Sequence, residues 1–72
     1  MKELTKSERM VLRCASYGLT ADETAMKMLR STTTVKYHRT NVLIKLRASN
    51  IAHAVALAYE GGIFGQLVEE AA

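Results

Sequence analysis

The chain has 72 residues, 49% of them hydrophobic, and a formal net charge of +3. This length allows one domain over residues 1–72, and the hydrophobic fraction excludes an intrinsically disordered chain. The sequence contains no apolar run close to the ~18–20 residues that a membrane span needs, and its start has no secretory signal. Its single cysteine, Cys14, cannot form an internal disulfide, which is typical of a reducing cytoplasm. We therefore expect one small cytoplasmic domain.

The charges are distributed unevenly along the chain. No acidic residue lies between Thr24 and Tyr59, and all seven acidic residues fall outside that range. A region of one sign flanked by acids is expected for a phosphate-binding surface, and it favours a nucleic-acid partner over an ordinary solvated helix face. The basic residues of this region are Lys27, Arg30, Lys36, Arg39, Lys45 and Arg47.

Two capping boxes mark the starts of the first two helices. In Thr5–Glu8 and again in Thr20–Glu23, a threonine and the glutamate three residues later can satisfy each other's backbone amides. Gly18 can end the first helix because glycine accepts the left-handed conformation. The chain has no proline and no alternation typical of strands. The sequence therefore predicts an all-α fold with helices over residues 6–17, 21–29, 32–46 and 51–60.

The third helix is expected to begin after Ser31. The run of hydroxyl residues in 31–34 competes with the helical backbone for hydrogen bonds, which favours a helix start at this point. The apolar spacing that follows predicts an amphipathic helix with one face toward the core. The residues on that face are Val35, Val42, Leu43 and Leu46.

The fourth helix is expected to be capped by Ser49 or Asn50 and to stop at the glycine pair that follows it. Beyond that pair, Ile63 and Phe64 are expected to fold back onto the core. Residues 66–72 are expected to form a short helical turn or a frayed tail.

The connection between the second and third helices is very short and is centred on Arg30 and Ser31. Such a connection forces a sharp turn, which is the geometry of a helix-turn-helix. In this motif the second helix enters the major groove of DNA by its N-terminal half, while the first helix crosses the backbone. We therefore expect the helix over residues 32–46 to face double-stranded DNA.

A pattern of residues along the chain resembles that of a known family. The matching positions are Leu4-Thr5, Glu8, Val11-Leu12, Gly18, Ala25, Ser31, Thr34-Val35-Lys36, His38, Lys45-Leu46, Ala54-Val55, Ala58 and Gly62-Ile63. They span residues 4–64 without gaps and resemble the LuxR/GerE-type helix-turn-helix domain. The resemblance implies a four-helix DNA-binding domain of bacterial transcription regulators, which often dimerises through its fourth helix.

The sequence departs from the family pattern at several positions. Ser7 and Ile51 stand where the family usually has arginine, and both changes remove polar partners around Glu8. Arg30 stands where isoleucine is usual, so we expect its charged end to reach solvent and a DNA phosphate. Further departures are Met10, Thr24, Arg47 and Ala48.

Base reading is expected from the outward face of the third helix. Lys36, Tyr37 and Thr40 share that face, and they match the base-reading positions that the resemblance implies. Lys36 can donate to guanine O6 and N7, and Tyr37 can contact a thymine methyl group or donate its hydroxyl. The alternative for Tyr37 is a half-buried surface aromatic, and for Thr40 a small residue that only permits close approach.

Phosphate contacts are expected at the start and on the flanks of the same helix. Free amides and hydroxyls at a helix N-terminus favour an anion, with simple capping as the alternative. The resemblance adds a phosphate-binding lysine at Lys45 and a histidine near the DNA backbone at His38. The expected phosphate contacts are Ser31, Thr32, Thr33, Thr34, His38, Lys45, Arg30 and Arg39, with Lys27 and Arg47 as further candidates.

The fourth predicted helix is apolar on nearly all sides, so we expect other parts of the protein or a partner to cover two opposite faces of it. A twofold homodimer through this helix would cover its second face and space two third helices about one DNA turn (~34 Å) apart. The expected dimer interface is His53, Ala56, Leu57 and Glu60. A poorly covered surface on a monomer is the alternative.

The sequence predicts a sequence-specific regulator of transcription, with RNA polymerase as a further candidate partner. The alternative is an interaction protein of the same fold that binds and blocks another regulator. An enzyme is not expected, because no catalytic triad, paired carboxylates or Gly-rich phosphate loop is present, and no metal or other cofactor is expected either. The sequence does not say which operator is bound or whether transcription is activated or repressed. It also leaves open whether the chain is a stand-alone protein or a domain of a larger one.

Overall fold

The computed structural model describes residues 3–63, which form four α-helices and no strand. The all-α fold expected from the sequence is confirmed. The first two helices end one residue before the predicted positions, whereas the last two have the predicted bounds. The expectations for Phe64 and for residues 66–72 lie outside the described residues. The helices are α1 (Lys6–Ser16), α2 (Ala21–Met28), α3 (Thr32–Leu46) and α4 (Ile51–Glu60).

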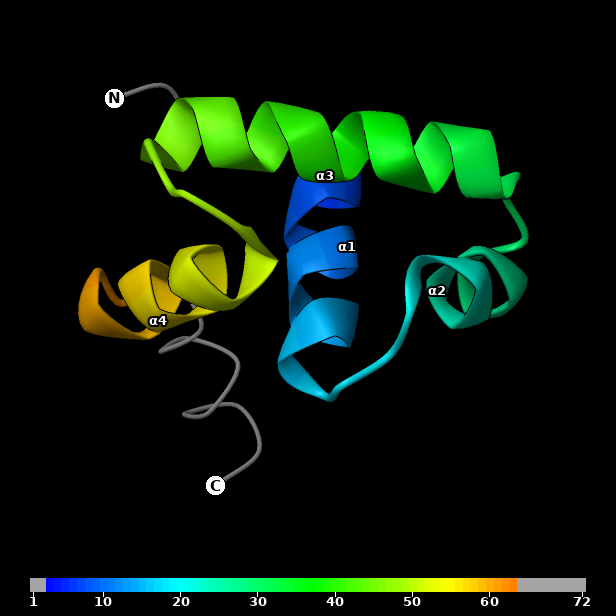
Figure 1. Ribbon diagram of the computed structural model, residues 1–72, viewed down its shortest axis with the longest axis horizontal. Coiled ribbons are helices and arrows are strands. Elements are labelled where there is room, and N and C mark those ends of the chain that lie inside the picture. The colour runs from blue at the N-terminus through cyan, green and yellow to red at the C-terminus, as the bar shows by residue number, and fades with distance from the viewer. Residues whose placement is uncertain (1–2, 64–72) are drawn as a thin grey trace.

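The helix α3 is the longest of the four and lies across one side of the molecule (Figure 1). The helix α1 runs away from the middle of α3, with α2 on one side of it and α4 on the other (Figure 1). Both α1 and α2 pack against α3, and α4 packs against α1 and α3. This arrangement leaves the side of α3 that faces away from α1 open to solvent.

Side-chain caps begin all four of these helices. Both capping boxes form, with Thr5 paired to Glu8 and Thr20 paired to Glu23. The N-cap of α4 is Asn50, whose Oδ1 accepts the His53 amide at 2.8 Å, so the cap is the second of the two expected candidates. The sequence therefore determines these helix starts locally, through hydrogen bonds that span three residues.

The helices α2 and α3 each end in a residue with a left-handed backbone conformation, and neither of these residues is glycine. The backbone φ angle is 56° at Leu29 and 55° at Arg47, and each residue is the C-cap of its helix. A residue with a Cβ atom loses roughly 1–2 kcal/mol in this conformation. Gly18, with a φ of 83°, follows α1 and accepts the same region without that cost. The left-handed Leu29 is why α2 stops at Met28.

The core consists of two clusters on either side of α1. One cluster joins Leu12 to buried residues of α3 and α4, and Ile63 packs against it as expected. The other joins Val11 to Ala25 of α2 and to α3. The expected inward residues of α3 are buried at positions 35, 42 and 46 and half-buried at 43. Packing against α1 therefore fixes which face of α3 points outward.

Candidate nucleic-acid interface

The outward face of α3 carries the three expected base-reading residues. Lys36, Tyr37 and Thr40 are all exposed, and 64% of the Tyr37 surface is accessible. The Thr40 hydroxyl donates to the Lys36 carbonyl oxygen at 3.1 Å, so it is bonded within the helix. Ile44 follows on the same face with 69% of its surface exposed. Ile44 was not among the residues predicted for this face, although its spacing of four residues from Thr40 places it there.

The start of α3 has one capped backbone amide and several hydroxyls that are hydrogen-bonded within the protein. Ser31 Oγ accepts the Thr34 amide at 3.1 Å and donates to Thr34 Oγ1 at 2.9 Å, while Thr32 Oγ1 donates to Asp22 Oδ1 at 2.8 Å. Thr33 is exposed. The first turn of α3 contains no acidic residue, whereas those of α1 and α2 do. The Asp22 carboxylate of α2, however, already lies beside the first residue of α3, at the positive end of its dipole.

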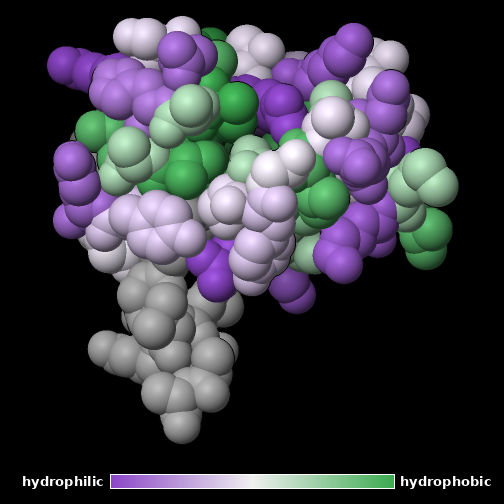
Figure 2. Space-filling model, turned by 60° about the horizontal axis from the view of Figure 1, so that its bottom comes forward, coloured by the Kyte–Doolittle hydropathy of each residue, from purple (hydrophilic) through white to green (hydrophobic). Residues whose placement is uncertain are grey.

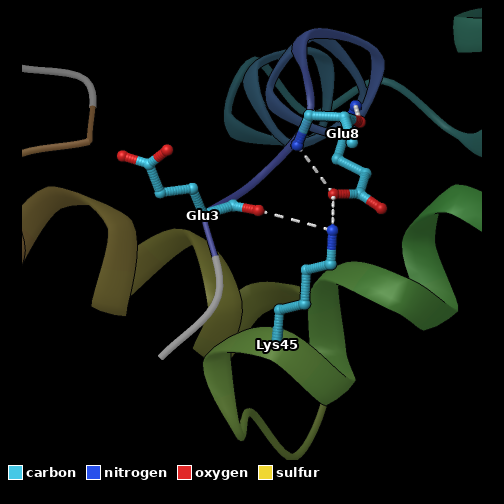
Figure 3. Close-up of polar contacts among 4 residues, drawn as sticks. Glu3, Glu8 and Lys45 are labelled. Atoms are coloured by element: carbon cyan, nitrogen blue, oxygen red, sulfur yellow. Dashed lines mark hydrogen bonds and ion pairs between the residues drawn. The ribbon is translucent and has the colours of Figure 1, made fainter.

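Lys45 points inward, although it was expected to contact phosphate. Its Nζ lies 2.7 Å from Glu8 Oε1 and donates to the Glu3 carbonyl oxygen at 3.4 Å (Figure 3). Only 21% of the Lys45 side chain and 4% of the Glu8 side chain are exposed. The structure thus gives Lys45 an internal partner 37 residues away, which local sequence patterns do not reveal. Lys45 is thus a cation that contacts the buried Glu8 carboxylate directly.

The charge of Glu8 is stabilised by the groups around it. Burial alone raises the pKa of this carboxyl group, but the hydrogen bonds from Lys45 and Thr5 and the Lys45 charge outweigh it. The net result is a Glu8 pKa below its ordinary value. Oε1 accepts both the Thr5 amide at 2.8 Å and the Lys45 ammonium. The ion pair is therefore built into the capping box of α1.

Arg39 and His38 lie on the flanks of α3 and are half-buried. Arg39 Nη2 donates to the Leu19 carbonyl oxygen at 3.0 Å, which ties α3 to the connection between α1 and α2. The His38 ring lies 5.8 Å from the Tyr37 ring, and its Nδ1 atom is buried without a hydrogen-bond partner. Arg30, by contrast, is exposed. Among the expected phosphate-binding residues, Arg30 is therefore exposed, whereas Arg39 and Lys45 are partly buried and hydrogen-bonded within the protein.

The expected dimer surface on α4 is exposed at three of its four residues. His53, Ala56 and Glu60 are exposed, whereas Leu57 is half-buried and packs against the core. His53 Nδ1 also accepts the Ser49 amide at 2.9 Å, so the imidazole is part of the helix start. A hollow of about 330 Å³ lies beside this surface and is lined by Leu46, Leu57, Glu60, Gly61 and Ile63.

Residues 3–63 contain neither a cluster of potential metal ligands nor a membrane-spanning helix. In this part of the chain no three His, Cys, Asp or Glu side chains come together as potential metal ligands. None of its helices is long and apolar enough to cross a membrane.

The comparisons with known proteins agree with this geometry. A family model described as "Bacterial regulatory proteins, luxR family" matches residues 2–58. The transcriptional regulatory protein FixJ of Rhizobium meliloti (strain 1021) is 36% identical over 62 residues. That alignment covers 86% of this chain and 30% of FixJ, so the chain spans less than a third of the length of this relative.

Proposed function

Because the chain belongs to the luxR family of bacterial regulatory proteins, we propose that it binds double-stranded DNA and regulates transcription. In this proposal α2 and α3 form the helix-turn-helix, and α3 reads base edges in the major groove. The name of FixJ, a transcriptional regulatory protein, supports the same assignment. The carrying observation is the outward face of α3, where Lys36, Tyr37 and Thr40 are exposed together.

Each exposed residue has a definite part in this proposal. Lys36 donates to guanine O6 and N7, Tyr37 contacts a thymine methyl group or donates its hydroxyl, and Thr40 lets the helix approach the bases closely. Ile44, one turn further along, adds an apolar surface to the same face. These contacts specify the DNA sequence, whereas contacts to phosphate only position the domain.

Phosphate binding is assigned to groups that the protein leaves open. The start of α3 offers backbone amides and the exposed Thr33, and Arg30 lies directly before it. The other hydroxyls of residues 31–34 serve as caps and as secondary contacts. His38 is a candidate through its side chain beside Tyr37. Arg39 and Lys45 have a lesser part in this proposal, because each already donates to a group within the protein, Arg39 to the Leu19 carbonyl oxygen and Lys45 to the Glu8 carboxylate.

A twofold dimer through α4 is the second part of the proposal. The exposed His53, Ala56 and Glu60 form its surface, with Leu57 at the edge toward the core. Ala56→Arg places a charge in this surface without touching the core. Sedimentation of this variant should give monomers if α4 forms the dimer, and an unchanged mass would contradict this contact.

Selection of bound DNA from a random pool is the most direct test of the proposed function. We expect a preferred sequence, and a dimer should give two related half-sites about one DNA turn (~34 Å) apart. A Lys36→Ala/Tyr37→Ala variant should keep its fold by circular dichroism and lose the sequence preference. A wild-type domain that selects no sequence, or a double variant that selects the same one, would contradict the groove-reading model.

A further inference from the structure

Asp22 lies beside the starts of two helices. It is in the first turn of α2, and its Oδ1 accepts the hydroxyl of Thr32, the first residue of α3, at 2.8 Å. The start of α3 lies next to α2 on one side of the molecule (Figure 1). A helix start carries the positive end of the helix dipole, which attracts a negative charge. One carboxylate is therefore placed where it stabilises both helices.

The charge of Asp22 is not paired with a cation of the protein. Asp22 is exposed, and within residues 3–63 it makes no ion pair. The Thr32 hydroxyl is neutral, so its hydrogen bond leaves the negative charge in place. Glu8 differs, because it is buried and paired with Lys45. Figure 2 shows that hydrophilic side chains cover much of the α2 side of the molecule, and Asp22 adds an unpaired acid to the polar surface of this helix.

The proposed function brings DNA phosphate to the same place. Arg30 and Thr33, the exposed groups to which phosphate binding is assigned, lie within two residues of Thr32. The first turn of α3 has no acidic residue of its own, so Asp22 supplies the negative charge at this helix start. Two anions at one helix start repel each other. A DNA phosphate that approaches Thr32 therefore meets the Asp22 carboxylate.

Resting on the proposed function, we propose that Asp22 competes with DNA phosphate at the start of α3 and so lowers the affinity of the domain for DNA of any sequence. Phosphates are alike at every base pair, so this repulsion carries no sequence preference. It subtracts from the part of the binding energy that all DNA shares. Contacts of Lys36 and Tyr37 to bases then make up a larger share of the binding energy at the preferred site.

Asp22→Asn provides a direct test, because the amide oxygen of asparagine still accepts the Thr32 hydroxyl while the charge is lost. Fluorescence anisotropy measures the binding of wild type and variant to the selected duplex and to an unrelated duplex of the same length. The affinity for both duplexes should rise by the same factor, roughly threefold to tenfold at low salt. The gain should shrink as the ionic strength rises, because salt screens an exposed charge.

Glu23→Gln is the matched control. It changes the net charge by the same amount at the next residue, but Glu23 Oε1 accepts the Thr20 amide at the start of α2, and glutamine also closes a capping box. This variant should raise the affinity less than Asp22→Asn does, because Glu23 makes no contact with α3 through its carboxylate within residues 3–63.

Three results would overturn the proposal. The first is an affinity that Asp22→Asn leaves unchanged or lowers. The second is a gain confined to the selected duplex, since Asp22 would then act on base reading. The third is an equal gain in Glu23→Gln, since net charge alone would then explain it. A wild-type protein that selects no DNA sequence would instead overturn the proposed function, and this inference with it.

Discussion

The two faces of α3 carry similar side chains but use them differently. On the side toward the core, the flanking Arg39 donates to the Leu19 carbonyl oxygen and Lys45 is paired with the buried Glu8. On the outward side, Lys36 and Tyr37 are both exposed, and within residues 3–63 the Lys36 ammonium has no ion pair or hydrogen bond. The basic residues of one helix are thus divided between holding the helix in place and facing a partner. Two of the three lysine and arginine side chains of α3, Arg39 and Lys45, thus already donate to groups within the protein.

The largest effect is expected from breaking the inward ion pair. Lys45→Ala leaves the Glu8 carboxylate buried without its cation, and the free energy of unfolding should fall by about 3 kcal/mol, which is measurable by urea denaturation. The double variant Glu8→Gln/Lys45→Met, which removes both charges, should recover part of this loss. If Lys45→Ala instead leaves stability unchanged and lowers the salt slope of DNA binding by ~0.9, Lys45 is a phosphate contact after all.

Removing the outward lysine should affect binding rather than stability. Lys36→Ala is expected to weaken binding to the selected DNA by about 1–3 kcal/mol and to relax the preference at one base pair, because a base contact is lost. Fluorescence anisotropy with the selected site and with single-base variants measures both effects. The control is Lys6→Ala, which removes an exposed lysine from α1. Equal losses in the two variants would mean that Lys36 acts only through its charge.

Substitutions of Arg39 test whether this residue stabilises the fold or binds phosphate. Arg39→Ala should lower the free energy of unfolding by about 1–2 kcal/mol, because the Leu19 carbonyl oxygen loses a charged donor. The salt dependence of DNA affinity should keep its slope, since no phosphate contact is removed. Arg39→Lys separates charge from geometry, because lysine keeps the charge and lacks the guanidinium fork. A slope that falls by ~0.9 in Arg39→Ala would move Arg39 to the DNA-binding set.

Acid should weaken the inward face by a smaller and gradual effect. The pKa of Glu8 is lower in the folded protein than its ordinary value, so this group adds stability at neutral pH. That contribution should be lost as the pH falls from about 5 through the lowered pKa. The free energy of unfolding should therefore decline more steeply with acid in the wild type than in Glu8→Gln. Parallel pH curves would show that Glu8 does not titrate differently on folding.

Local patterns predicted the fold well because its helix starts are local. The caps at Thr5, Thr20 and Ser31 each need only a partner three residues away, and all three form as expected. The ends of α1 and α2 were each one residue too long in the prediction. At Leu29 the helix ends in a left-handed leucine, a residue type that gives no signal of that conformation.

The candidate site was predicted less completely, for a physical reason. The outward positions of α3 follow from helical spacing, and Lys36, Tyr37 and Thr40 are exposed there. The internal roles of Arg39 and Lys45 depend on contacts 20 and 37 residues away, which no periodicity encodes. Charge suggested Arg39 as a phosphate contact and the family resemblance suggested Lys45, whereas the structure gives each of them a partner within the protein.

One oxygen atom joins the start of α1 to the last turn of α3. Glu8 Oε1 accepts from the Thr5 amide and from Lys45 at the same time, so fraying of α1 at its beginning also releases Lys45. The last turn of α3 is consequently held by Lys45 only while the first turn of α1 stays folded. Opening of the two segments is thermodynamically coupled, and the domain gains cooperativity between positions that are distant in sequence.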